Sequence, residues 1–306
     1  MPFRALSTLF VMMVVGCGSS ATHECEGLSA EQCAQPDGGM PDGGMPLDPE
    51  LVVEIDWLEA HLGDPDVQPI DTRASGYDAS RIPGAIHLKP GDLARTVDGV
   101  PQQVMPPMEA QPVLRAMGLR NDVIALVYGV PQEYDPSRVV WTLRYYGHAD
   151  VRYLDGGYEA WVAVDGALDA DPPNVEPTEY TIVGVDDSLR VTGDWVLSQL
   201  GDPPAIQLVD ARSESEYANG RIPSARSVNW ERNLDSGFLR SVSDLEALYE
   251  GMDPAMTTVT YCVSGWRGSF AWLTLTALGY EDVRLYDGSW NEWGSEGSGF
   301  PVEPPQ

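Results

Sequence analysis

Short apolar runs alternate with longer amphipathic stretches through the C-terminal third of the chain. The pattern predicts helices over 191–200, 241–251 and 268–278 and strands over 205–209, 257–261 and 283–286. Strands that alternate with helices favour an α/β domain, a mainly parallel sheet with helices on both faces. Reactive groups in such sheets lie beyond the carboxyl ends of the strands, so residues that directly follow a predicted strand are candidates for chemistry.

The chain contains an internal repeat. Asp-x-Arg, followed by Tyr and Arg-Ile-Pro, occurs at 71–83 and returns at 210–223, and Val-Arg-x-x-Asp-Gly occurs at 151–156 and returns at 283–288. Two blocks in the same order indicate two copies of one domain, and the period is too long for a solenoid. We place the copies at 51–168 and 189–300, with a Pro-rich linker over 169–188.

Cys262 is the strongest candidate for chemistry. It directly follows the predicted strand 257–261 and precedes Val263-Ser264-Gly265-Trp266-Arg267-Gly268, where a new helix begins. A loop of this kind directs backbone N–H groups and a positive helix end at one sulfur, which favours the reactive thiolate. The alternative is a small, buried, apolar cysteine. The polar and Gly-containing segment after Cys262 favours a reactive, exposed thiol.

The N-terminus has the features of a bacterial lipoprotein signal. A short basic start and an apolar run over 5–15 lead to Gly16-Cys17, and the run is too short for a permanent membrane helix. We expect residues 1–16 to be removed and Cys17 to be lipidated, although an ordinary secretory peptide is the alternative. Residues 17–50 contain a repeated Pro-Asp-Gly-Gly-Met unit that predicts a flexible tether. The expected location is the bacterial cell envelope, on the periplasmic side of the outer membrane.

Charge and cysteine content limit the partners. Removal of 1–16 takes away one of the 18 basic residues, Arg4, and leaves 17 against 47 acidic ones, a net charge of −30. Such a chain repels nucleic acid and anionic lipids, so we expect membrane attachment through the lipid alone. Cys25 and Cys33 either form a disulfide or stay free, which leaves Cys262 alone in the folded region. No Cys and His cluster has the spacing of a metal site, and no cofactor is expected.

These motifs together resemble the rhodanese superfamily, specifically its tandem-domain sulfurtransferases. The resemblance covers residues 51–300 and includes the strand that leads into Cys-x-x-Gly-x-Arg and the following Leu-Gly-Tyr. It implies a monomeric enzyme that moves sulfur from a small anionic donor such as thiosulfate to cyanide or a thiol. The sulfur would be carried as a persulfide on Cys262.

The resemblance also assigns roles around Cys262. The N–H groups of Val263, Ser264, Gly265, Trp266, Arg267 and Gly268 would stabilise thiolate and persulfide, and Arg267 would hold the anionic donor. Two interpretations of Trp266 stay open, a wall of the cleft or a contact with the first domain. The first domain would be inactive, because either Gly129 or Val130 stands opposite Cys262, and its role would be structural, as a wall on one side of the cleft.

Other polar residues have simpler interpretations. Arg212 and Arg221 are expected to pair with Asp210 or Glu216 and hold the fold, with a substrate role for Arg212 as the alternative. Trp230 either lines the mouth of the site or belongs to the core. Asp287-Gly288 is expected to form a turn between a strand and a helix.

The chain departs from the family in ways that affect substrate choice. Mercaptopyruvate-using relatives carry an arginine shortly after Asp-x-Arg, whereas 213–217 contains Glu214 and Glu216 and no arginine. The active loop of those relatives ends in Gly-Val-Thr, and here it ends in Gly-Trp-Arg. These differences argue against tight binding of mercaptopyruvate and leave the donor open.

Competing functions are distinguishable. A phosphatase of the related group has five residues between Cys and Arg, and here there are four; a cysteine protease needs a histidine, and all four histidines precede the second domain. The remaining alternatives are a non-catalytic sulfur-binding or scaffolding lipoprotein and a relay that passes the persulfide to a protein thiol.

Overall fold

The computed structural model describes residues 46–171 and 174–304. The expected signal peptide, the lipidation site Cys17, and Cys25 and Cys33 lie outside the described residues. No helix in the described part is long and apolar enough to cross a membrane.

The first half of the described chain forms a five-stranded parallel sheet. Its strand order is β1-β7-β6-β2-β3. The strands are β1 (Val52–Val53), β2 (Val67–Asp71), β3 (Ile86–His87), β6 (Ile124–Tyr128) and β7 (Asp150–Leu154). The helices are α1 (Ile55–His61), α2 (Pro107–Ala116), α3 (Asp135–Tyr145) and α4 (Gly157–Ala163), with the 3-10 turn η1 (Pro90–Leu93).

The second half repeats this topology. Its parallel sheet has the order β8-β14-β13-β9-β10, in which each strand takes the place of its counterpart in the first sheet. The strands are β8 (Arg190–Val191), β9 (Gln207–Asp210), β10 (Arg226–Ser227), β13 (Thr258–Tyr261) and β14 (Val283–Tyr286). The helices are α5 (Gly193–Gln199), α6 (Glu214–Ala218), α7 (Val242–Leu248), α8 (Trp266–Ala277) and α9 (Ser289–Trp293), with 3-10 turns η2 (Asp187–Leu189) and η3 (Trp230–Asn233). The predicted α/β fold with two tandem copies of one domain is confirmed.

Two predicted helices begin at other residues than expected. Val191 lies in β8 rather than in a helix, because the Thr192 side chain accepts a hydrogen bond from the Trp195 N–H and starts α5 at Gly193. The predicted helix 268–278 begins at Trp266 instead, since Gly265 adopts a positive φ of 81° as its N-cap. This second shift brings the start of the helix closer to Cys262.

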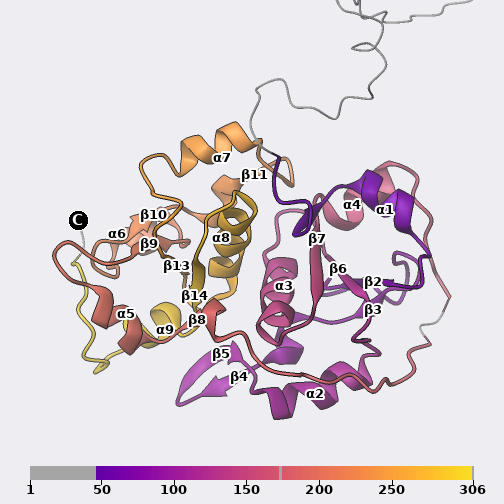
Figure 1. Cartoon of the computed structure of the whole chain (residues 1–306), viewed down its shortest axis with the longest axis horizontal. Helices are drawn as coiled ribbons and strands as arrows, with labels where there is room; N and C mark the ends of the chain where they lie inside the picture. Colours follow the sequence, from indigo (N-terminus) through magenta and orange to yellow (C-terminus); the bar gives the residue numbers. More distant parts are fainter. Residues whose placement is uncertain (1–45, 172–173, 305–306) are drawn as a thin grey trace, which may run out of the picture. The chain divides into compact units, whose positions relative to one another are not determined.

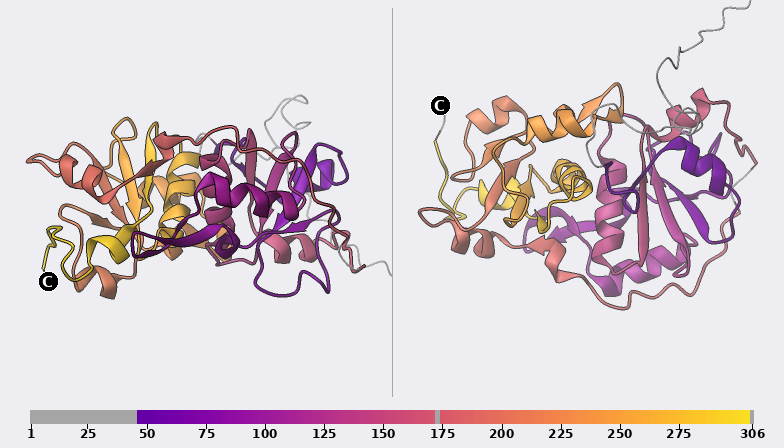
Figure 2. Two further views of the ribbon diagram at one scale, coloured as in Figure 1. Left: turned by 90° about the horizontal axis from the view of Figure 1, so that it is seen from below. Right: turned by 45° about the horizontal axis from the view of Figure 1, so that its top comes forward.

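Each half also extends a short antiparallel hairpin. β4 (Ala94–Val97) pairs with β5 (Val100–Val104), and β11 (Leu234–Asp235) pairs with β12 (Phe238–Leu239). The β4–β5 hairpin reaches the second half, where the Val104 N–H donates to Asp287 Oδ2 at 2.9 Å (Figures 1 and 2). The β11–β12 hairpin makes the matching contact in return, from the Leu239 N–H to Asp155 Oδ1 at 3.0 Å.

The two halves share one interior. Helices α3 and α8 pack side by side between the sheets (Figure 1). The Ser137 and Ser269 hydroxyls meet there at 3.1 Å, and Tyr153 and Phe270 pack edge to face. The largest apolar cluster contains side chains from both halves. Burial of these apolar side chains sets the position of the first half relative to the loop that follows β13.

Candidate functional site

Cys262 lies at the carboxyl end of β13, as the sequence predicts. All four residues of β13 are buried, and the strand lies between β9 and β14 in the sheet. Gly265 ends the loop after Cys262 in a left-handed conformation. A Cβ at Gly265 would lie 3.0 Å from the Asp287 carbonyl oxygen, so glycine fits both the φ and the space.

The backbone of Cys262 is fixed by α9. The Cys262 N–H donates to Ser289 Oγ at 3.2 Å, and the Cys262 carbonyl accepts from the Trp290 N–H at 3.0 Å. The next carbonyl, that of Val263, accepts from the Asn291 N–H at 2.8 Å. With its carbonyls bound to α9, the loop leaves its N–H groups for other partners.

Six consecutive N–H groups follow Cys262 in the loop and in the first turn of α8. Within the part of the chain that the structure describes, the N–H groups of residues 263–268 donate to no protein acceptor, and the first N–H after them, that of Ser269, donates to the Gly265 carbonyl at 2.9 Å. The last three belong to the first turn of α8, whose N-terminus carries partial positive charge. This arrangement can stabilise an anion on Cys262 without a metal or a general base.

The Cys262 side chain is buried, with 1% of its surface exposed, which corrects the expectation of an exposed thiol. The sulfur belongs to the apolar cluster that also holds Trp230 and Phe270. It is nevertheless a free cysteine. The residues that follow it, Val263 and Ser264, line an open pocket of about 480 Å³, which lies beside the loop that begins at Cys262.

Both halves of the chain line the pocket. Four of its residues were named from the sequence, and they are Val263, Ser264, Trp266 and Arg267; a fifth, Trp230, lies 6% exposed and serves both core and pocket. No motif in the sequence points to the other three, Gln102, Tyr134 and Glu231. Gln102 and Tyr134 belong to the first half, and only the packing of the two halves brings them to Cys262.

Trp266 satisfies both of its sequence interpretations. Its ring lines the pocket, and its Nε1 donates to the Gln102 carbonyl in β5 at 3.2 Å. Tyr134 packs its ring edge against Trp230 with ring centroids 5.2 Å apart. Burial, together with neighbouring Asp135 and Cys262, raises the pKa of Tyr134, so its hydroxyl stays protonated. The first half therefore supplies a wall and a hydroxyl group to the pocket.

Arg267 is held by Glu216 from α6. Its Nη1 and Nη2 donate to Glu216 Oε2 and Oε1 at 2.8 and 2.9 Å, a bidentate ion pair. Glu216 also accepts from the N–H and hydroxyl of Ser213. The hydrogen bonds from Arg267 lower the pKa of Glu216 to about 2, and the pKa of Arg267 is raised in return. Both residues were singled out from the sequence, but their ion pair was not predicted.

The other candidate arginines hold the fold. Arg212 forms the expected buried pair with Asp210 at 2.6 Å, and its guanidinium lies over the Trp290 ring. Arg221 pairs with Glu303 at 2.6 Å rather than with Asp210 or Glu216, because the C-terminal segment forms an antiparallel bridge beside it. Asp287 forms the predicted turn between β14 and α9 and is fully buried.

The first half has no nucleophile at the matching position. Tyr128 and Tyr261 donate to Asp71 and Asp210 in the same way, and the Tyr158 N–H donates to the Gly129 carbonyl as the Trp290 N–H does to Cys262. These contacts place Gly129, not Val130, opposite Cys262. A Cβ at Gly129 would lie 2.7 Å from Pro136, so the site is filled by packing.

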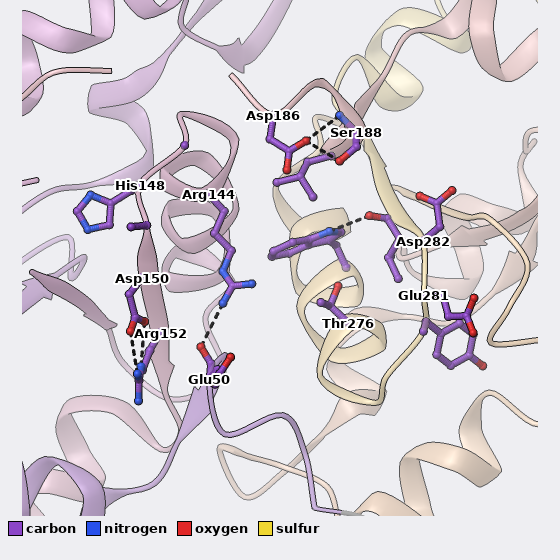
Figure 3. A pocket seen from close by; sticks show the side chains of 16 residues that line it. Glu50, Arg144, His148, Asp150, Arg152, Asp186, Ser188, Thr276, Glu281 and Asp282 are labelled. Atoms are coloured by element: carbon purple, nitrogen blue, oxygen red, sulfur yellow. Dashed lines mark hydrogen bonds and ion pairs between the residues drawn. The ribbon is translucent and has the colours of Figure 1, made fainter. Parts of the chain in front are cut away.

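A second groove lies at the other end of α8. It has a volume of about 570 Å³, and Figure 3 shows Arg144 and Glu50 on one wall and Thr276 and Asp282 on the other. Helix α8 has 12 residues, about 18 Å in length, which separates this groove from Cys262. The residues that line the groove include no cysteine.

The described residues contain no cluster of His, Cys, Asp or Glu that could hold a metal ion. The candidate site consists of Cys262, the N–H groups that follow it, and the pocket residues from both halves.

Comparison with known proteins gives consistent matches over both halves. The model of the rhodanese-like domain matches residues 54–164 and again 192–296. A thiosulfate sulfurtransferase from Corynebacterium glutamicum is 30% identical over 269 residues, covering 81% of this chain and 88% of the relative. A sulfur carrier protein, TtuD from Thermus thermophilus, is 32% identical over 272 residues, covering 81% of this chain and 94% of the relative.

Among solved structures, that of SseA from Escherichia coli, described as a 3-mercaptopyruvate sulfotransferase, superposes with a TM-score of 0.71 at 26% identity. The match covers 78% of this chain and 98% of that one.

Proposed function

The chain belongs to the rhodanese-like domain family and is a sulfurtransferase of that family, and we propose that it carries the transferred sulfur as a persulfide on Cys262. One observation carries the assignment to Cys262. It is a free cysteine at the end of a central strand, followed by six N–H groups that make no hydrogen bond within the described protein. Thiolate and persulfide place negative charge at the same position, and the same N–H groups stabilise both.

The proposed reaction has two displacements. The Cys262 thiolate attacks the outer sulfur of thiosulfate, the S–S bond of thiosulfate breaks, and its electron pair leaves with sulfite. The outer sulfur stays on Cys262 as an anionic persulfide. Cyanide then attacks this outer sulfur, the bond between the two sulfurs breaks, and its electron pair returns to Cys262. Thiocyanate leaves and the thiolate is restored, with no net proton transfer.

Residues around the pocket support the first displacement. The N–H groups of 263–268 hold the sulfur anion, and Arg267 presents the one cationic side chain among the residues that line the pocket. Tyr134 lines the same pocket and its raised pKa keeps the hydroxyl protonated, so we propose that it donates to a sulfonate oxygen of the donor. Burial of Cys262 restricts access of bulky oxidants, which protects the thiolate between turnovers.

A relay to a protein thiol is a second candidate. The similarity of this chain to the sulfur carrier protein of Thermus thermophilus favours it, since the match covers 94% of that relative. The two acceptors use the same Cys262 persulfide, so they differ only in the second displacement. The unsatisfied N–H groups argue against a purely scaffolding role, which requires no such loop.

We further propose that the protein is lipid-anchored in a bacterial cell envelope through Cys17. The proposal is supported by the apolar run over 5–15, by Gly16 immediately before Cys17, and by the Gly- and Pro-rich segment that follows. Metabolic labelling with a fatty acid tests it. Label that is present on the wild type and absent from Cys17→Ser is expected, and equal labelling of both would contradict the proposal.

Turnover tests the enzymatic proposal. The full-length protein in detergent is expected to convert thiosulfate and cyanide to thiocyanate, and Cys262→Ser is expected to lose this activity completely. Cys33→Ser, which removes a thiol outside the second domain, is the matched control and is expected to keep it. Equal activity of Cys262→Ser and wild type would contradict the role of Cys262.

A further inference from the structure

The pocket beside Cys262 has little free positive charge. Arg267 is the one cation among the eight residues that line it, and Glu231 is also among them. Both terminal nitrogens of Arg267 are bound to Glu216, whose two oxygens complete a bidentate pair. The Nε–H and one further N–H on each terminal nitrogen make no hydrogen bond to another described residue, so Arg267 keeps donors while Glu216 offsets its charge.

Carboxylates from the first half add negative charge near the pocket. Asp135 and Glu133 lie close enough to Tyr134 to raise its pKa further, after burial has done so. Glu231 in η3 is exposed at the rim and bonded only to the neighbouring Asn229. With the charge of Arg267 offset by Glu216, the carboxylates of Glu231, Asp135 and Glu133 leave a net negative charge on the side chains at and beside the pocket. Anions are held here by backbone N–H groups rather than by a free cation.

The net negative charge at the pocket has its largest effect on the second displacement, in which the acceptor attacks the persulfide. The persulfide already occupies the N–H groups, so an incoming acceptor with a further negative charge meets carboxylates and no unpaired cation. At separations of about 8 Å and an intermediate dielectric constant, one unit charge changes the interaction by about 1 kcal/mol, about fivefold in rate.

We propose that Glu216 determines acceptor specificity by cancelling Arg267, and that the preferred acceptor is a thiol with a nearby ammonium group. This inference rests on the proposed persulfide of Cys262. In the step concerned, the acceptor thiolate attacks the outer sulfur of the anionic Cys262 persulfide and forms a new S–S bond. The bond between the two persulfide sulfurs breaks and its electron pair stays on the Cys262 sulfur. The products are the anionic persulfide R–S–S⁻ and the Cys262 thiolate, so atoms and charge balance.

Three small thiols that differ in charge test the inference. Their thiolate forms carry net charges of zero for cysteamine, minus one for 2-mercaptoethanol and minus two for 3-mercaptopropionate. Full-length protein is first loaded with thiosulfate and freed of excess donor. Loss of the extra sulfur is then followed by intact mass in a single turnover. For each thiol, the rate with Glu216→Gln is divided by the rate with wild type, which removes the intrinsic reactivity of the thiol.

The expected ratio rises by about fivefold for each added negative charge on the acceptor. Glu214→Gln changes an exposed carboxylate on the same helix that forms no ion pair among the described residues, and its three ratios are expected to be equal. Glu231→Gln, an exposed change at the pocket rim, is expected to shift the ratios in the same direction as Glu216→Gln. If Glu216→Gln fails to fold, the three ratios of Glu231→Gln still report the effect of charge at the pocket.

Failure of the inference and failure of the proposed function give different results. Equal ratios for all three thiols in both pocket variants would overturn the role of Glu216 while the persulfide stands. Absence of any sulfur gain on wild-type Cys262 would overturn the proposed function itself.

Discussion

Ser289 holds the active loop at the scale of single residues. Its Oγ accepts the Cys262 N–H at 3.2 Å and donates to the Tyr286 carbonyl at 2.7 Å, and it does so with a positive φ of 51°. The first half has Gly157 at this position, with a φ of 57° and no side chain to bond a loop. The hydroxyl thus distinguishes the half with a nucleophile from the half without one.

Replacement of Ser289 tests this role. Ser289→Ala leaves the buried Cys262 N–H without its acceptor, and we expect a loss of about 1–3 kcal/mol in the free energy of unfolding and slower loading of Cys262. Ser289→Gly loses the same hydroxyl but relieves the backbone strain, so its loss of stability should be smaller. Denaturant unfolding measures both, and a Ser289→Ala variant as stable as wild type would show that the hydrogen bond is dispensable.

Single residues were also where the sequence was most informative. Cys262 and the residues of its loop follow directly from a strand, a glycine and a helix start, because these are local features. The pairing of Arg267 with Glu216 was not predictable. It joins two helices that are distant in sequence, and several carboxylates competed for each arginine.

At the scale of elements, the junction of β7 and α4 contains a buried carboxyl group with a raised pKa, that of Asp155. Asp155 accepts the Gly156 and Leu239 N–H groups, yet burial dominates and raises its pKa to about 6 from an ordinary value of 3.8. Its counterpart in the second half, Asp287, instead faces Arg138 at 2.8 Å and Arg190 at 3.3 Å. The β11–β12 hairpin is thus hydrogen-bonded to a carboxyl group of the first half, that of Asp155, which forms no ion pair with an arginine among the described residues.

This difference predicts a dependence of stability on pH. Because the folded pKa is above the unfolded one, the protonated form is favoured by folding, so the contribution of Asp155 is fully present below about pH 4 and is lost as the pH rises to about 6. The loss is at most about 3 kcal/mol. Asp155→Asn is expected to remove this part of the dependence in denaturant unfolding, whereas Glu159→Gln, an exposed change in α4, is expected to retain it. A profile unchanged in Asp155→Asn would contradict the assignment.

The elements themselves were predictable except at their ends. The strand 283–286 matches β14, while the helix predicted from residue 268 begins at Trp266. The apolar periodicity locates a helix, but its first residue is decided by backbone conformation, here the positive φ of Gly265. That detail matters, because it puts the N–H groups of Trp266 and Arg267 in the first turn of α8, which carries the positive end of the helix dipole.

At the scale of the whole molecule, the two halves build one site. Helices α3 and α8 pack together, the β4–β5 hairpin reaches Asp287, and Gln102 and Tyr134 thereby line the pocket beside Cys262. The inactive first domain was expected from the sequence to form one wall of the cleft. The residues that do so, Gln102 and Tyr134, were not predictable, because the internal repeat holds no information on how the two domains pack.

The overall charge predicts an unusual dependence on salt. With a formal net charge of −29, the protein repels a dianionic donor, and the one cation at the pocket is paired. Salt screens repulsion over a distance of about 10 Å at 0.1 M, so kcat/KM for thiosulfate is expected to rise by about threefold between roughly 10 and 150 mM sodium chloride. Steady-state kinetics measure this change. A fall with salt would indicate that an unpaired cation guides the donor.

The most direct test of the Cys262 persulfide is the mass of the peptide that contains Cys262 after the full-length protein has been exposed to thiosulfate. We expect a gain of one sulfur atom on this peptide, reversed by cyanide and absent from Cys262→Ser. A protein that turns over thiosulfate while the Cys262 peptide gains no sulfur would contradict it.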